Sequence, residues 1–153
     1  MNAVSDDVIH TVCPSCGRRN RVPVARLHGH GRCGACHQPL FRGRPLALDD
    51  ATFPRYLQAE ALPVVVDFWA GWCGPCKAMA PVFEAAAGAF EPSARFVKVD
   101  VEAAPATATR YAIRSIPTLA IFRDGAQIAT AAGAMPAAQL RGWIQQHLAV
   151  AAG

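Results

Sequence analysis

The chain has 153 residues, of which 52% are hydrophobic, and a formal net charge of +4. This length accommodates one full domain and a small accessory domain, and the apolar content is ample for a hydrophobic core. No run of 18 apolar residues exists and the first seven residues contain no apolar segment, which argues against a membrane-spanning helix or a secretory signal and favours the cytosol.

Two cysteine pairs define the first third of the chain. Cys13 and Cys16 are followed, after 16 intervening residues, by Cys33 and Cys36. This spacing is typical of a zinc ribbon, in which four thiolates close a tetrahedral Zn²⁺ shell. Such a site leaves no coordination position open, so we expect one structural zinc ion. The cytosol keeps thiols reduced, which favours metal binding, but two disulfides remain the alternative.

Glycines and histidines surround these cysteines. Gly17 and Gly34 would allow the backbone to curl so that its amides face the sulfurs. Four thiolates already saturate zinc, so the nearby histidines are expected to be surface residues: His10, His28, His30 and His37.

Residues 1–45 are strongly basic. They carry a net charge of +5, whereas residues 46–153 carry −1. A basic ribbon raises the possibility of nucleic-acid binding, but no aromatic residue lies between the cysteine pairs to stack on bases. A solvated basic face is the ordinary alternative. The arginines of this segment are Arg18, Arg19, Arg21, Arg26, Arg32, Arg42 and Arg44.

The remainder of the chain alternates strand and helix patterns. We expect a strand at 45–48, a helix that is capped by Asp49 or Asp50 and ends near Ala59, a buried strand at 63–69 and a helix at 75–90 that Pro81 bends. A strand at 96–101 and a helix near 105–112 follow, and then a hairpin of strands 118–122 and 126–130 around Asp124 and Gly125. The last helix begins at about Pro136 and includes His147 as a packed or surface residue. This order predicts an α/β sandwich around a central sheet.

A second kind of cysteine pair lies between the buried strand and the helix that follows it. Cys73 and Cys76 flank Gly74 and Pro75, and Pro75 suits the first helical turn. The amino-terminal end of a helix stabilises a thiolate, which is the form that attacks disulfides. The pattern therefore favours a redox dithiol over a structural cysteine pair.

One acid interrupts the buried strand. An unpaired carboxylate at Asp67 would be costly to bury, and such a group tends to have a raised pKa and to exchange a proton. A carboxylate that is merely hydrogen-bonded at the end of the strand is the alternative. Lys98 lies on the adjoining strand, where a lysine is commonly solvated.

These motifs together resemble the thioredoxin family. The resemblance rests on residues 66–70 (VDFWA), on 72–77 (WCGPCK), on Ile116, Pro117 and Thr118, and on Gly133. The amino-terminal ribbon is similar to that of the bacterial zinc-containing members. The resemblance implies a thioredoxin fold, in which helices flank a central mixed sheet, over residues 44–153, with the zinc ribbon at 1–43.

The resemblance also implies a mechanism. An exposed Cys73 attacks the substrate disulfide, and a buried Cys76 resolves the mixed disulfide. Asp67 would deprotonate Cys76, and Lys98 would modulate Asp67. The Ile116–Pro117 bond would be cis. Trp69 is expected to pack in the core because it lies on the buried strand. The partner-docking surface would comprise Trp72, Gly74, Pro75, Ile116, Pro117 and Gly133.

The implied activity is that of a protein-disulfide reductase. Its partners would be proteins with disulfides and an NADPH-dependent thioredoxin reductase, and the chain would be a monomer without membrane or nucleic-acid partners. A disulfide oxidase or isomerase remains the alternative enzyme. A zinc-dependent binding or chaperone module with an appended redox domain remains an alternative of a different class.

Overall fold

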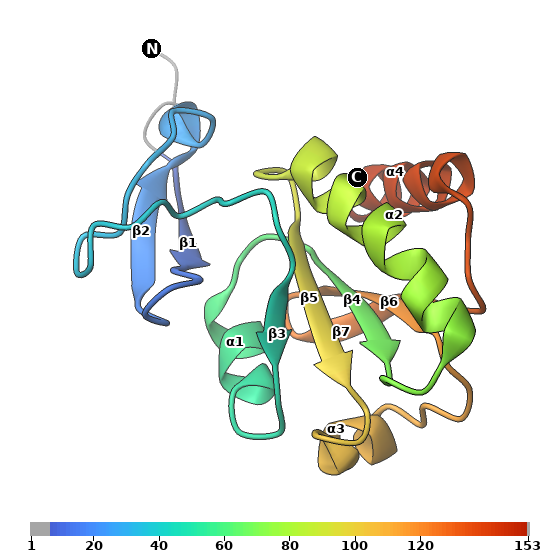
Figure 1. Cartoon of the computed structure of the whole chain (residues 1–153). Helices are drawn as coiled ribbons and strands as arrows, with labels where there is room; N and C mark the ends of the chain where they lie inside the picture. The colour runs from blue at the N-terminus through green and yellow to red at the C-terminus, as the bar shows by residue number, and fades with distance from the viewer. Residues whose placement is uncertain (1–6, 153) are drawn as a thin grey trace.

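The structure is a computed structural model that describes residues 7–152, and the side chains of residues 7–148. Residues 1–6, part of the stretch in which the sequence shows no apolar signal, lie outside the described residues. A two-stranded hairpin and a larger α/β unit follow one another along the chain (Figure 1). The elements are β1 (Val8–Val12), β2 (Arg19–Pro23), a 3₁₀ turn (Val24–Arg26), β3 (Leu46–Leu48), α1 (Phe53–Ala59), β4 (Val64–Trp69), α2 (Gly74–Phe90), β5 (Arg95–Asp100), α3 (Pro105–Arg110), β6 (Thr118–Arg123), β7 (Ala126–Ala132) and α4 (Ala137–Ala152).

The larger unit contains one mixed sheet with the strand order β3-β5-β4-β6-β7. Strands β3, β4 and β5 run parallel, whereas β6 is antiparallel to both β4 and β7. The order of helices and strands from β3 to α4 is the one expected from the sequence. The expected hairpin is also present, and Asp124 and Gly125 both have positive φ there.

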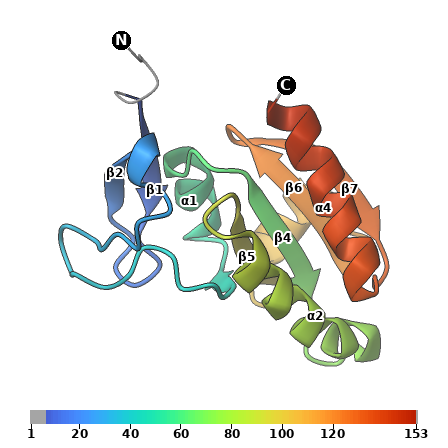
Figure 2. The same cartoon turned by 90° about the horizontal axis from the view of Figure 1, so that it is seen from above.

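Side-chain alternation along the central strands builds two cores. Val64, Val66 and Phe68 of β4 pack in a cluster with residues of α1, whereas Val65 packs on the opposite face with residues of α2 and α4. Figure 2 shows α2 and α4 together on one side of the sheet. Because successive side chains of a strand point to opposite faces, Asp67 belongs to the face covered by α2.

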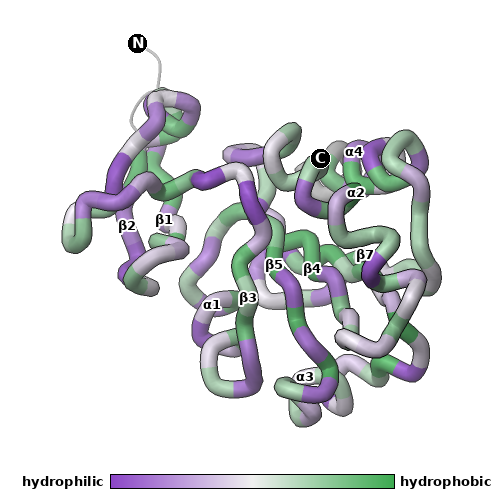
Figure 3. The backbone as a smooth tube through the Cα atoms, viewed as in Figure 1, coloured by the Kyte–Doolittle hydropathy of each residue, from purple (hydrophilic) through white to green (hydrophobic). Residues whose placement is uncertain are grey.

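The hydropathy of the strands follows this arrangement. Figure 3 shows β4 as largely hydrophobic and β2 as hydrophilic. Strand β4 has five of its six residues buried, because helices cover both faces of the sheet. Strand β2 has no buried residue, because it pairs with β1 alone.

The start of α1 differs from the expectation. The helix begins at Phe53 with Thr52 as its N-cap residue, and neither predicted aspartate caps it. Asp49 accepts bonds from the backbone N–H groups of Ala51 and Thr52, which forms a turn before the helix. Asp50 instead accepts from the backbone and hydroxyl of Thr107, at the start of α3. A tertiary contact therefore takes the place of the predicted cap.

Helix α2 continues from Gly74 to Phe90 with Pro81 inside it.

Candidate active site and metal site

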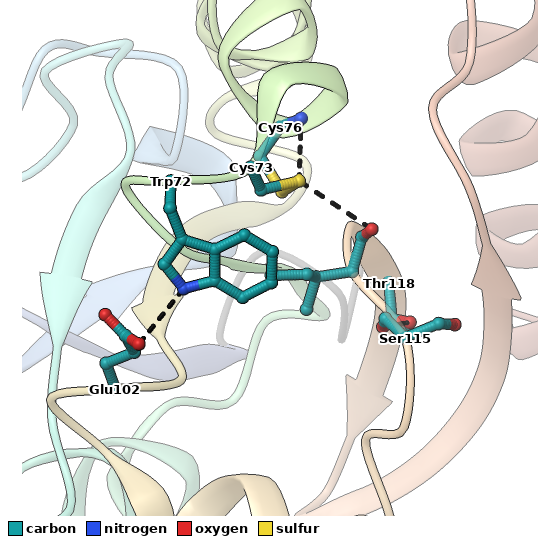
Figure 4. Close-up of a disulfide and its surroundings, with 7 residues drawn as sticks. Trp72, Cys73, Cys76, Glu102, Ser115 and Thr118 are labelled. Atoms are coloured by element: carbon teal, nitrogen blue, oxygen red, sulfur yellow. Dashed lines mark hydrogen bonds between the residues drawn. A yellow bond between two sulfur atoms is a disulfide. The ribbon is translucent and has the colours of Figure 1, made fainter.

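The dithiol lies where β4 passes into α2. Cys73 is the N-cap residue of α2, and its sulfur is bonded to that of Cys76 in a disulfide whose Cα atoms are 5.2 Å apart. The backbone N–H of Cys76 donates a hydrogen bond of 3.2 Å to the Cys73 sulfur (Figure 4). A donor at a helix amino terminus stabilises negative charge on that sulfur. The site can therefore carry out thiol–disulfide exchange.

The exposure of Cys73 differs from the expectation. Its exposed fraction is only 4%, and that of Cys76 is 2%. In the disulfide form, the Cys73 sulfur is bonded to Cys76 and lies 3.7 Å from the carbonyl oxygen of Ile116. The expected difference in exposure between the two cysteines is therefore absent in this redox state. The exposed residue of the site is Trp72, at 68%.

The loop before β6 lies against the disulfide. The Ile116–Pro117 peptide bond is cis, as the resemblance implied, and Pro117 is buried. The carbonyl of Pro117 accepts a 2.8 Å bond from the N–H of Gly133, which connects this loop to the end of β7. Gly133 has a φ of 97°, a conformation that strains other residues. The side chain of Thr118 donates to the carbonyl of Ser115 and fixes the loop (Figure 4).

The expected docking residues meet at this end of the sheet. Trp72, Gly74 and Pro75 are exposed around the disulfide, and Ile116 is half-buried beside it. The structure thus brings sequence-distant residues to one surface.

The sequence did not single out Glu102, which accepts a hydrogen bond of 3.0 Å from the indole of Trp72. An exposed glutamate in a loop has no sequence signal that marks it.

Asp67 is a buried carboxylate without a partner. It is 1% exposed, and neither carboxylate oxygen has a hydrogen-bond partner among the described residues. The alternative of a merely hydrogen-bonded carboxylate is therefore wrong for this structure. Burial raises the pKa of Asp67 to about 6, and the charge of Lys98 lowers it in part. Such a carboxyl group can exchange a proton near neutral pH.

Lys98 pairs with Asp67 in the register of β4 and β5. It is half-buried, and its Nζ lies 4.5 Å from the centroid of the Trp69 ring. Lys98 is therefore held over an aromatic face rather than being fully solvated. Trp69 is itself only partly buried, which differs from the expected core position.

The four ribbon cysteines come together at the tip of the β1–β2 hairpin and the loop that follows β2. All four are free thiols, and their sulfur atoms lie within 4.8 Å of one another. The Sγ atoms of Cys13 and Cys36 are 3.6 Å apart, as are those of Cys16 and Cys33. A tetrahedral zinc ion with ligands at about 2.3 Å requires sulfurs about 3.8 Å apart. The cluster therefore fits a metal and does not contain the two alternative disulfides.

The backbone turns around the cysteines are partly as expected. The N–H of Gly17 bonds to the carbonyl of Cys13, and the N–H of His37 bonds to that of Cys33, each at 2.9 Å. Both turns end in a residue with positive φ, Gly17 at 82° and His37 at 66°. The second turn thus uses His37, and not Gly34, for the left-handed conformation.

Amide donors surround the sulfurs. The N–H groups of Ser15 and Ala35 lie 3.3 Å from the sulfurs of Cys13 and Cys33. No sequence pattern marks Asn20 of β2 as a neighbour of the cysteines. Its Nδ2 donates to the Cys33 sulfur at 3.4 Å, and its Oδ1 accepts from the N–H of Gly34 at 2.9 Å. These donors stabilise thiolates and orient the second cysteine turn.

The histidines take no part in the cysteine cluster of the described chain. His28, His30 and His37 are exposed as expected, whereas His10 is half-buried. His147 packs against Trp143, and its Nδ1 lies 2.8 Å from the Trp143 carbonyl.

Among residues 7–152, no helix is both long and apolar enough to cross a bilayer.

Comparison with known proteins gives two family matches. Residues 44–146 match the family described as "Thioredoxin", and residues 12–38 match the domain described as "Thioredoxin 2, N-terminal". The boundaries agree with the separation of the ribbon from the larger α/β unit in the structure.

Individual relatives agree with these matches. The chain is 42% identical to "Thioredoxin C-3" of Corynebacterium nephridii over 137 residues, which cover 90% of this chain and 94% of that one. It is 44% identical to "Thioredoxin 1" of Synechococcus elongatus over 67% of this chain and 95% of the relative. It is 36% identical to the chloroplastic "Thioredoxin M-type" of Chlamydomonas reinhardtii over 86% of this chain and 96% of the relative. The chain therefore belongs to the thioredoxin family of thiol–disulfide oxidoreductases, with an amino-terminal zinc ribbon of the thioredoxin 2 type.

Proposed function

We propose that Cys73 is the attacking thiol of this protein-disulfide reductase and that Cys76 is the resolving thiol. The observation that carries the assignment is the hydrogen bond from the Cys76 N–H to the Cys73 sulfur at the start of α2. A thiolate at Cys73 retains this donor and the field of the helix. Cys76 lies one turn further into α2, so its sulfur is not at the amino-terminal end of the helix.

The exchange begins with the reduced dithiol. The Cys73 thiolate attacks one sulfur of the substrate disulfide, forms a mixed disulfide and releases the other substrate sulfur as a thiolate that takes up a proton. The Cys76 thiol then loses its proton, and its sulfur attacks that of Cys73. The second substrate sulfur leaves and is protonated. The substrate gains two electrons and two protons, and the protein is left with the Cys73–Cys76 disulfide.

Asp67 is the proposed acceptor of the Cys76 proton. Two features support this role: Asp67 lies on the sheet face covered by α2, and Cys76 is among the buried residues of that helix. A carboxyl group with a pKa of about 6 can take a proton at neutral pH and release it again. The positive charge of Lys98 lowers the pKa of Asp67 and so keeps it available as a base.

The proposed cofactor is one Zn²⁺ ion held by Cys13, Cys16, Cys33 and Cys36. The sulfur separations and the amide donors to Cys13 and Cys33 support this assignment. With four protein ligands the ion would have no open position, so its contribution is to cross-link the two cysteine turns. The redox reaction proceeds at the other cysteine pair.

The proposed partners are proteins with disulfides and an NADPH-dependent flavoprotein thioredoxin reductase, which returns the dithiol to its reduced form. We further propose a monomer in the cytoplasm that binds neither membranes nor nucleic acids. Four free cysteines suited to metal support a reducing compartment.

The test is a coupled assay that follows NADPH oxidation in the presence of thioredoxin reductase and insulin. We expect the full chain to sustain turnover, and a fragment of residues 44–153 to retain it because Cys73, Cys76, Asp67 and Pro117 remain. An inactive full chain with intact dithiol would contradict the reductase function. A folded but inactive fragment would show instead that the ribbon takes part in catalysis.

The ribbon supports a second candidate, a docking module. All six of its arginines are exposed: Arg18, Arg19, Arg21, Arg26, Arg32 and Arg42. Arg44, which follows the ribbon directly, is exposed as well. A surface of this charge favours acidic partners. Under this alternative, removal of the ribbon would lower partner binding and leave the reduction of insulin unchanged.

A further inference from the structure

Trp72 and Glu102 form a hydrogen bond at the edge of the disulfide. The indole Nε1 of Trp72 donates to Oε2 of Glu102 at 3.0 Å, and Figure 4 shows the ring lying between Glu102 and the disulfide. Trp72 is 68% exposed, so little packing holds its ring. The bond to Glu102 therefore limits the orientations of the largest apolar side chain beside the reacting sulfurs.

Glu102 is itself held in place. Its backbone N–H donates a 2.9 Å bond to Oδ1 of Asp100, which is the last residue of β5. The loop that carries Glu102 is thus tied to the end of the central sheet, next to the end of β4, with which β5 runs parallel. The carboxylate is positioned before any partner arrives, and this lowers the entropic cost of docking.

The charge of Glu102 is not neutralised within the protein. Over the described side chains, the ion pairs are those of Arg95, at the opposite ends of the strands. The indole N–H occupies Oε2, and Oε1 makes no hydrogen bond to any described residue. Several other charged residues lie on the elements that form the site: Asp67 and Lys98 on β4 and β5, Asp100 at the end of β5, Lys77 on the first turn of α2, and Arg114 two residues before Ile116.

We infer that Glu102 is a specificity-determining residue: it orients Trp72 on the docking surface and places a negative charge beside the dithiol, which favours protein disulfides flanked by basic residues. This inference rests on the proposed function, because it assumes that partners dock over Trp72. Rim charges of this kind change association rates and their dependence on salt more than they change the chemical step.

The test compares two disulfide peptides of equal length that differ only in having lysine or glutamate beside the cysteines. Each is mixed with pre-reduced protein under single-turnover conditions, so that the dithiol of Cys73 and Cys76 donates two electrons and two protons to the peptide. The second-order rate constant is measured by chromatography of the peptide products. For the natural chain we expect the lysine peptide to react ~2–5-fold faster, as for exposed charge pairs, and the difference to disappear in 1 M salt.

Two substitutions separate charge from orientation. Both charged peptides are compared with a third peptide that has no charge beside its cysteines. Glu102→Gln keeps an acceptor for the indole and removes the charge, so it should abolish the preference between the lysine and glutamate peptides. Glu102→Ala removes both, so it should also slow reduction of the uncharged peptide and shift the emission of Trp72. Asp124→Asn is the matched control, because it removes one charge at the β6–β7 turn, where the left-handed backbone (φ 53°) suits asparagine.

The outcomes are separable. If Glu102→Gln keeps the natural preference, or if Asp124→Asn reduces it equally, the role of Glu102 is overturned. If the natural chain reduces neither peptide, the proposed function fails, and the inference fails with it. The inference is supported if both Glu102 variants lose the preference for the lysine peptide and Asp124→Asn keeps it.

Discussion

Arg95 and Glu60 form a buried ion pair that joins the ribbon to the redox domain. Arg95 Nε donates to Glu60 Oε1 at 3.0 Å, and both side chains are buried. The same Glu60 oxygen accepts from the hydroxyl of Thr11 and the N–H of Val12. Arg95 also donates to the carbonyls of Val12 and Leu40. The ribbon is therefore anchored where β4 and β5 begin, at the opposite ends of these strands from the dithiol.

Removal of the arginine should destabilise the protein strongly. Arg95→Ala leaves the Glu60 carboxylate buried without its cation, and such changes typically cost about 3–5 kcal/mol. The free energy of unfolding, measured with urea on the oxidised, zinc-loaded protein, checks this. Arg21→Ala is the control, because Arg21 is exposed and should change stability by less than about 0.5 kcal/mol. Equal effects of the two substitutions would contradict the anchoring role.

Asp67 should make stability depend on pH. Burial raises its pKa from 3.8 to about 6, so between these pH values the folded protein holds a proton that the unfolded chain has released. The free energy of unfolding therefore falls as the pH rises from about 4 to about 6. Relative to Asp67→Asn, the natural protein should lose about 2 kcal/mol between pH 4 and pH 8. Urea unfolding of both oxidised proteins measures the difference, and parallel pH profiles would contradict the raised pKa.

The same substitution should slow catalysis. Asp67→Asn removes the proposed acceptor of the Cys76 proton, and general-base groups typically contribute 10²–10⁴-fold to a rate. We expect a loss at or below the low end of this range, about 100-fold or less, because water can replace a carboxylate in part. Single-turnover reduction of insulin from pH 6 to pH 8 measures it. Unchanged rates across this range would exclude the proton-transfer role.

The two redox cysteines should behave differently when each is replaced. Cys76→Ser leaves an attacking thiol without a resolving thiol, so substrate proteins should accumulate as mixed disulfides with Cys73. Cys73→Ser should capture none through this site. Non-reducing gel electrophoresis after incubation with insulin distinguishes the two. Equal capture by both variants would show that the assigned roles are wrong.

Asn20 should contribute to metal retention. Its amide bonds to the Cys33 sulfur and to the N–H of Gly34, and loss of such neighbours typically lowers metal affinity 10–100-fold. Asn20→Ala should therefore bind zinc more weakly in competition with a chromophoric chelator, with one ion per chain in both proteins. Arg21→Ala, on the next residue of β2, should retain the natural affinity. A metal-free natural protein prepared without oxygen would refute the zinc assignment itself.

Local sequence patterns determined much of this protein. The order of elements from β3 to α4, the dithiol at the start of α2 and the four cysteines of the ribbon all follow from spacing over a few residues. Such patterns are readable because hydrophobic periodicity and turn chemistry act between close neighbours in the chain. The hairpin around Asp124 and Gly125 is one example.

Only the tertiary structure decided how distant polar residues pair. Arg95 meets Val12 across 83 positions, Asp50 reaches Thr107 instead of capping α1, and Trp72 bonds to Glu102 across 30 positions. The burial of Asp67 without a partner likewise depends on which helix covers its face of β4. These relationships follow from the strand order β3-β5-β4-β6-β7, which brings together segments far apart in the chain and which no local period encodes.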